Sequence, residues 1–211
     1  MADYAAFFDG AWHRLRQAEL YAAASGLGNP AWAEASLRVL VLRLSPFRDV
    51  DRSTPHLFLA QAVRAAVPGA WLDFCFFPPE ADRRLLESSG LPLVTGLASR
   101  RSMEDFDLLL ASCSYHLELL NLYYLLRQAG VPLRASVRKA FPLLIVGGSS
   151  SMAAQGLIFP DGDCLADGLF FGEGEGQVEA LVRVLAQGRG RPRRERPSRT
   201  NRRCRPGTPG R

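Results

Sequence analysis

The sequence predicts an α/β fold in which five parallel strands form one sheet with helices on both faces. Short apolar runs and amphipathic segments alternate five times along the 211 residues of the chain. This alternation is typical of parallel sheets, because parallel neighbours need a long, usually helical, crossover between them. Two of the runs stop abruptly at glycine, at Gly147 and at Gly172, as expected for buried parallel strands that end in tight turns.

The strands and helices follow from local signals. The strands are predicted at Leu37–Leu44, Ala70–Phe77, Phe106–Ser112, Leu143–Val146 and Leu169–Phe171, with a short edge piece at Leu91–Val94. The helices are predicted at Pro55–Val67, Glu80–Ser89, His116–Gln128 and Glu175–Ala186, with a short helix after the serine-rich turn that follows the fourth strand. Ser53-Thr54-Pro55 suits a helix start, and Gly90 suits a helix end.

The composition divides the chain into three regions. Residues 1–36 form an N-terminal helical extension, and the three-to-four spacing of apolar positions predicts a helix over residues 1–26. Residues 37–188 form the α/β domain. Residues 189–211 contain no leucine, isoleucine, valine or aromatic side chain, so this tail cannot bury a core and is expected to be disordered.

The net charge of +5 comes wholly from the tail. Residues 189–211 hold ten arginines and one acid, a net charge of +9, whereas residues 1–188 hold 16 basic and 20 acidic residues, a net charge of −4. An arginine-rich arm can bind nucleic acid. The tail has no aromatic side chain for base stacking, however, so we favour the ragged end of a truncated chain or coding sequence translated out of frame.

Several other classes of function lack support. No apolar run approaches the roughly 18–20 residues of a membrane span, and the N-terminus lacks the basic start and clean apolar segment of a secretory signal. We therefore expect a cytoplasmic protein without a membrane partner. The four cysteines are separated by 38, 51 and 40 residues, which matches no zinc or locally coded iron–sulfur motif. No metal ligand, Ser-His-Asp triad or other catalytic residue is predicted.

The stretch from Pro142 to Gly176 carries the main functional signal. Its two apolar runs meet Gly147-Gly148 and the segment Gly172–Gly176, where the backbone can turn tightly and approach another group closely. Ligands of open α/β sheets lie just beyond the carboxyl ends of the strands, so we expect a ligand at these turns. The second turn is not a dinucleotide fingerprint, because it follows the last strand instead of the first.

The order of these pieces resembles that of a known family. RVLVLRLSP, STPHLFLAQAV, DFDLLLASCSYHLELLNLYYLLRQAGVPLRA, FPLLIVGGSSS and DGLFFGEGEGQVEALVRVLA follow one another along the chain. Together they are similar to the N-terminal cobalamin-binding domain of class B radical S-adenosylmethionine (SAM) enzymes, especially uncharacterised bacterial ones. The resemblance covers about Leu37 to Gln187 and implies a flavodoxin-like sheet with cobalamin held face-on at the strand ends.

The resemblance also implies which residues contact the cofactor. The corrin ring of such domains lies over three loops, which match Ser112–Tyr115, Gly147–Ser150 and Gly172–Glu175 here, and two further residues lie on the same edge. The predicted cofactor-binding residues are Ser45, Thr54, Ser112, Cys113, Ser114, Tyr115, Gly147, Gly148, Ser149, Ser150, Gly172, Glu173, Gly174 and Glu175.

Two departures from the family pattern bear on function. The downstream radical domain, with the CxxxCxxC motif of its iron–sulfur cluster, is absent from this chain, and so is the DxHxxG motif whose histidine ligates cobalt in other cobalamin domains. The resemblance thus implies a cobalamin-binding module for methyl transfer or other radical chemistry, with the cluster and SAM bound by a catalytic domain or chain elsewhere. The alternatives are a non-catalytic flavodoxin-like domain that binds a nucleotide or a partner protein, and an arginine-tailed nucleic-acid binder.

Several candidate residues also have a purely structural explanation. The serines at the strand ends could bind corrin amides or phosphate, or they could cap helices. Glu173 and Glu175 are interpreted as helix-start residues stabilised by the helix dipole, with their backbone amides as the ligand contacts, and not as a catalytic pair. His116 is expected to pack or cap, and Cys113 to be a small buried residue in a strand–helix turn.

Overall fold

A computed structural model describes residues 4–24, 27–138, 142–150 and 155–188. The strands are β1 (Leu37–Arg43), β2 (Ala70–Phe76), β3 (Leu108–Ser112), β4 (Leu143–Gly147) and β5 (Gly168–Leu169). The α-helices are α1 (Tyr4–Gly10), α2 (Ala18–Ala23), α3 (Phe47–Val50), α4 (Pro55–Ala66), α5 (Glu80–Ser88), α6 (Glu118–Gln128) and α7 (Gln177–Gln187). Short 3₁₀ helices occur at Trp12–Arg14, Trp32–Glu34, Met103–Asp105 and Ala135–Val137.

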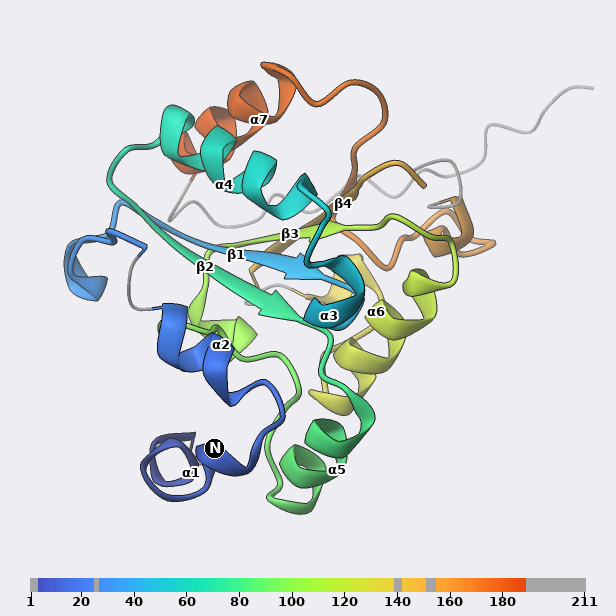
Figure 1. Cartoon of the computed structure of the whole chain (residues 1–211). Helices are drawn as coiled ribbons and strands as arrows, with labels where there is room; N and C mark the ends of the chain where they lie inside the picture. The colour runs from blue at the N-terminus through green and yellow to red at the C-terminus, as the bar shows by residue number, and fades with distance from the viewer. Residues whose placement is uncertain (1–3, 25–26, 139–141, 151–154, 189–211) are drawn as a thin grey trace, which may run out of the picture.

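The strands form one parallel sheet in the order β2-β1-β3-β4-β5 (Figure 1). This is the strand order of flavodoxin-like folds. The predicted fold class is therefore confirmed, with each of the five main strands within two residues of its expected start and end.

Helices cover both faces of the sheet (Figure 1). Helices α4 and α7 pack together over one face, α1, α5 and α6 lie on the other, and α2 packs against both cores. Successive side chains of a strand point to opposite faces, so β1 contributes to two cores. Val41 packs in the cluster that contains Val63 of α4, whereas Leu42 packs in the cluster that contains Leu122 of α6.

The prediction of one helix over residues 1–26 is wrong for the described residues. The chain forms α1, one 3₁₀ turn and α2, with a break between them. At this break the N–H groups of Arg16 and Gln17 donate to the carboxylate of Asp82, at 2.7 and 3.1 Å. Asp82 is buried, so this tertiary acceptor replaces intrahelical carbonyls. Phe8 and Leu15 are buried in the core on the α5 and α6 side.

The short edge strand predicted at Leu91–Val94 is also wrong. The backbone of this segment bonds to the side chain of Gln128 on α6, which donates to the Leu91 carbonyl and accepts from the Leu93 N–H. A side chain thus takes the place of a neighbouring strand. The short helix predicted after the serine-rich turn falls partly on residues 151–154, which lie outside the described residues.

Candidate functional site

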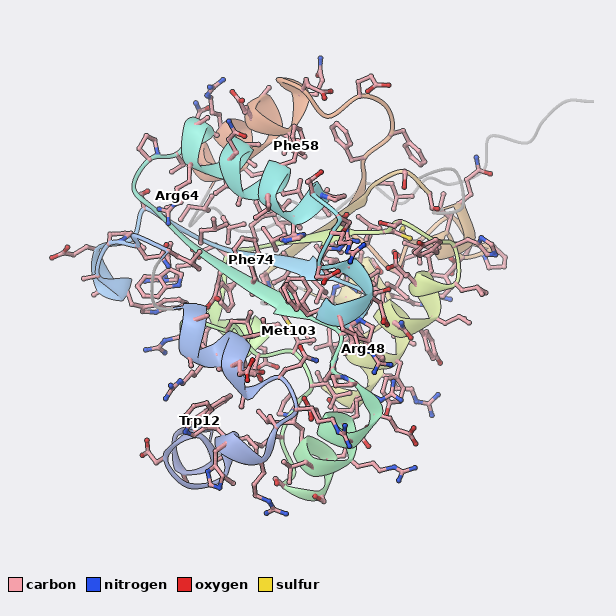
Figure 2. The ribbon with its side chains drawn as sticks, viewed as in Figure 1. Trp12, Arg48, Phe58, Arg64, Phe74 and Met103 are labelled. Carbon is pink, nitrogen blue, oxygen red and sulfur yellow. The ribbon has the colours of Figure 1, made fainter. Side chains whose placement is uncertain are left out.

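A cavity of about 690 Å³ lies at the carboxyl ends of β3 and β4 and beside the segment that follows β5. Its lining includes residues of α4 and α7, the two helices that cover one face of the sheet. Figure 2 labels Phe58, which lies on the side of α4 toward α7 and contributes to the cavity wall. The other apolar walls come from Pro55, Leu59, Leu110, Ala111, Ile145, Phe170, Val178 and Leu181.

The structure brings nine of the fourteen predicted cofactor-binding residues to this cavity. These nine are Thr54, Ser112, Gly147, Gly148, Ser149, Gly172, Glu173, Gly174 and Glu175. The other five predicted residues are not part of its lining: Ser45, Cys113, Ser114, Tyr115 and Ser150. All of these five except Ser150 belong to the loops after β1 and β3, next to the cavity.

Glycine at the strand ends serves two different purposes. Gly148 has a φ of 120°, and a Cβ there would lie 2.3 Å from the Cys113 carbonyl oxygen, so glycine is required by the packing of the two loops. A Cβ on Gly174 would meet the Phe58 ring at 2.8 Å. Gly172 has a φ of 103° with no other atom within 4 Å of a Cβ, so it faces open space. Gly172 therefore leaves the most room for a ligand among these three.

The segment Gly172–Gly176 presents free backbone donors. Helix α7 begins at Gln177, after Gly176 turns the chain with a φ of 70°. The interpretation of Glu173 and Glu175 as helix-start residues is therefore wrong, because both precede the residue that caps the helix. Within the described part of the chain, the N–H groups of residues 172–176 donate no hydrogen bond to protein atoms, so they are available to a ligand.

A buried arginine that is not among the predicted site residues lies next to the cavity floor. Arg43 is the last residue of β1 and has no exposed surface. It donates from Nη1 to Ser112 Oγ at 2.8 Å and from Nη2 to Ser114 Oγ at 3.1 Å. Burial lowers the pKa of Arg43, and the nearby Glu118 carboxylate opposes that shift. Its Nε is buried without a hydrogen-bond partner among the described residues.

Glu118 is the acidic counterpart of Arg43, and it explains why two predicted serines do not reach the cavity. It is the first residue of α6 and only 4% exposed. Its carboxylate accepts the Ser45 hydroxyl hydrogen and the N–H groups of Ser114 and Tyr115. Ser45 and Ser114 are thus used to bind side chains within the protein. A sequence signal existed for Arg43, the charged residue at the end of an otherwise buried apolar run.

The histidine and cysteine near the β3–α6 loop are placed as structural residues. Cys113 is buried, and its Sγ contacts the Tyr115 carbonyl oxygen at 3.0 Å. Burial, followed by the charge of Glu118, raises the pKa of Cys113 to about 11, so it is a neutral thiol at pH 7. His116 is exposed and does not line the cavity.

The five-stranded parallel sheet, with a cavity at the carboxyl ends of its strands, defines an α/β domain of the flavodoxin-like class. Residues 61–204, more than half of the chain, match the family model described as radical SAM proteins, N-terminal. The chain therefore belongs to this family of N-terminal domains of radical SAM proteins. No curated protein and no solved structure matches the chain. Among the helices that the structure describes, none has the length and apolar character needed to cross a membrane.

Proposed function

We propose that the chain is the cobalamin-binding module of a radical SAM enzyme. Family membership supplies the radical SAM part of this proposal. The cobalamin part rests on one observation, the cavity whose rim is formed by two glycine-rich segments at the carboxyl ends of parallel strands. Cobalamin, when bound, supplies methyl transfer or other radical chemistry, and a separate catalytic domain or chain supplies the iron–sulfur cluster and SAM.

The residues at the cavity fit the periphery of a corrin. Corrin side chains end in carboxamides, which both donate and accept hydrogen bonds. The free N–H groups of residues 172–176 can donate to carboxamide oxygens, and the carboxylates of Glu173 and Glu175 can accept from carboxamide nitrogens. Gly172 leaves space for close approach. A volume of about 690 Å³ can enclose part of a cobalamin while the remainder lies over the rim.

The described part of the cavity lining offers cobalt no histidine nitrogen and no sulfur ligand. None of the described residues that line the cavity is a histidine, cysteine or methionine. His56 lies in the core against Phe74 and Phe76, and Cys113 points toward its own loop. This chain would therefore hold cobalamin through the corrin periphery and nucleotide tail, without a ligand from these residues to the metal.

The electrostatic character of the cavity favours cobalamin over a free nucleotide. Phosphate groups are usually bound with the help of arginine or lysine side chains. Among the described residues, the lining contains two carboxylates and no basic side chain. A di- or triphosphate placed in this cavity would face Glu173 and Glu175, whereas a corrin brings neutral carboxamides to the same rim.

Hydroxocobalamin binding tests the proposal directly. Purified protein is incubated with hydroxocobalamin at micromolar concentration, separated by gel filtration and followed by the visible spectrum of the cofactor. We expect co-elution at one cofactor per chain. Electron paramagnetic resonance of the bound, reduced cofactor should show no hyperfine coupling to a protein nitrogen, because the described residues of the lining include no histidine.

Two tryptophan variants locate the binding site. Thr54 is an exposed residue of the cavity lining, so Thr54→Trp should cover the mouth and weaken binding at least about tenfold. Leu57 is an exposed residue of α4, which begins directly after Thr54, and it does not line the cavity, so Leu57→Trp should bind as the wild type does. Elution of the cofactor apart from wild-type protein would overturn the proposal, and binding of a nucleotide instead would support the nucleotide-binding alternative.

A further inference from the structure

Ser112 at the cavity floor has a hydroxyl hydrogen that no atom of the described residues accepts. It is the last residue of β3, it is 3% exposed, and it lines the cavity. Its Oγ accepts from Arg43 Nη1 at 2.8 Å. Within the described part of the chain, Ser112 Oγ donates to no acceptor. A buried donor without an acceptor is costly, so this hydroxyl needs a partner inside the cavity.

Arg43 fixes the direction of that hydroxyl. A guanidinium has five N–H donors and no acceptor, so Ser112 cannot donate to it and must accept from it. Arg43 has no exposed surface, and its second amino group is held by Ser114 Oγ at 3.1 Å. The Ser114 N–H is in turn held by the buried Glu118 carboxylate. The guanidinium therefore cannot turn away and leave Ser112 free to reverse its role.

We propose that Arg43 is a positioning residue that makes Ser112 an obligate hydrogen-bond donor to the ligand. The ligand atom at the floor must then be an acceptor, such as a carboxamide or phosphate oxygen, and not an N–H group. The hydrogen bond is strengthened because Ser112 Oγ itself accepts from a cation. The rim has the opposite character, since Glu173 and Glu175 are acceptors, so the cavity selects a ligand orientation. The identity of the ligand rests on the proposed function, but the direction of the hydroxyl does not.

Neutron diffraction tests the direction without any ligand. In crystals of the cofactor-free protein exchanged into D₂O, the deuteron on Ser112 Oγ should point into the cavity, toward an ordered water. A deuteron directed at a protein carbonyl oxygen would overturn the inference. This outcome does not depend on whether the protein binds cobalamin, so it separates the inference from the proposed function.

Binding to variants tests the consequence for the ligand. Ser112→Ala should weaken hydroxocobalamin binding about five- to tenfold, the usual effect of one lost hydrogen bond, whereas Ser53→Ala, outside the lining, should have no effect. Arg43→Lys keeps the charge but loses the forked donor set, so it should weaken binding as well. In the double variant the two effects should not add, because Arg43 acts through Ser112. Additive effects, or unchanged affinity in Ser112→Ala, would overturn the proposal.

Cobinamide identifies which part of the cofactor supplies the acceptor. Cobinamide keeps the corrin carboxamides but lacks the nucleotide tail. If Ser112 contacts a corrin carboxamide, Ser112→Ala weakens cobinamide and hydroxocobalamin binding by the same factor. If Ser112 contacts the nucleotide tail, Ser112→Ala weakens hydroxocobalamin binding alone. Circular dichroism and the urea midpoint of each variant establish that it is folded, so that a loss of affinity is not mistaken for a loss of structure.

Discussion

The ends of β1 and β3 differ from the ends of β4 and β5, although all four lie on the same edge of the sheet. At β1 and β3 the space is filled by charged side chains, with Arg43 and Glu118 both buried and joined through serine hydroxyls and backbone amides. At β4 and β5 glycines take the place of larger side chains: Gly148 lets the turn after β4 pack against the loop after β3, and Gly172 after β5 faces open space. One half of the edge thus uses side chains to fix geometry, and the other half omits them to make room.

Because of this difference, the cavity does not lie at the position where open α/β sheets usually bind their ligands. In open α/β sheets the ligand crevice lies where the strand order reverses, which is between β1 and β3 in this sheet. The lining contains residues of β3 and β4 but none of β1. Arg43 and Glu118 occupy the neighbourhood of the reversal point, so the ligand space is displaced toward β4 and the segment after β5. The ends of β1 and β3, with the buried Arg43 and Glu118, then form a rigid wall beside the ligand space at β4 and β5.

Neutralising Glu118 should cause the largest loss of stability. Glu118→Gln replaces an acceptor of three hydrogen bonds with a group that carries its own N–H donors, and it leaves Arg43 buried without a nearby negative charge. We expect a loss of about 3 kcal/mol in the free energy of unfolding, measured by urea denaturation. The control is Glu80→Gln on α5, whose exposed carboxylate forms an ion pair with exposed Arg84, where the change should stay within about 0.5 kcal/mol. Equal losses of stability in the two variants would mean that the buried network around Glu118 does not stabilise the ends of β1 and β3.

The same contrast explains what could be predicted from the sequence. The strands and the glycine turns were predicted because apolar runs and glycines have meaning at the level of a few residues. Arg43 and Glu118 lie 75 positions apart, and their relation appears only when β1 and β3 become neighbours. Ser45 and Ser114 were predicted as ligand contacts for the same reason: their hydroxyl groups are visible in the sequence, but the buried partners that use them are not.

Predictions from local sequence were also wrong where a distant side chain accepts or donates the backbone hydrogen bonds of a segment. The apolar spacing of the N-terminal segment predicted one helix, but the buried Asp82 carboxylate provides a better set of acceptors for the N–H groups of Arg16 and Gln17. The extended residues near Leu93 suggested a strand, but Gln128 satisfies their backbone. In both cases a single distant side chain decided the local structure, and no pattern in the segment itself contains that information.

Adding a methyl group at two of the glycines should separate packing from open space. Gly148→Ala should cost about 2–3 kcal/mol, because its positive φ is strained for alanine and the new Cβ would collide with the Cys113 carbonyl oxygen. Gly172→Ala shares the positive φ but meets no atom, so strain alone should cost about 1 kcal/mol. Thermal unfolding monitored by circular dichroism measures both. If Gly172→Ala were the more destabilising variant, the glycine segment after β5 would be packed rather than open.

Acidification should lower the free energy of unfolding through His56, and we expect this to be the smallest of the three effects. His56 is buried on α4 between the rings of Phe74 and Phe76, and its Nδ1 has no hydrogen-bond partner among the described residues. Burial, and then the charge of Arg43, lowers the pKa of His56 below its ordinary value of 6.5. The unfolded chain therefore takes up a proton before the folded chain does, so stability is full above pH 6.5 and falls as the pH drops below it. We expect the free energy of unfolding to fall by up to about 1 kcal/mol per pH unit between pH 6.5 and 5.5, measured from the urea midpoint.

Two histidine variants test the assignment to His56. His56→Phe keeps an aromatic ring in the same space and should flatten the dependence of the urea midpoint on pH, whereas His116→Gln, at an exposed histidine, should retain it. If the urea midpoint of His56→Phe still falls with pH as in the wild type, the pH dependence of stability comes from another titrating group.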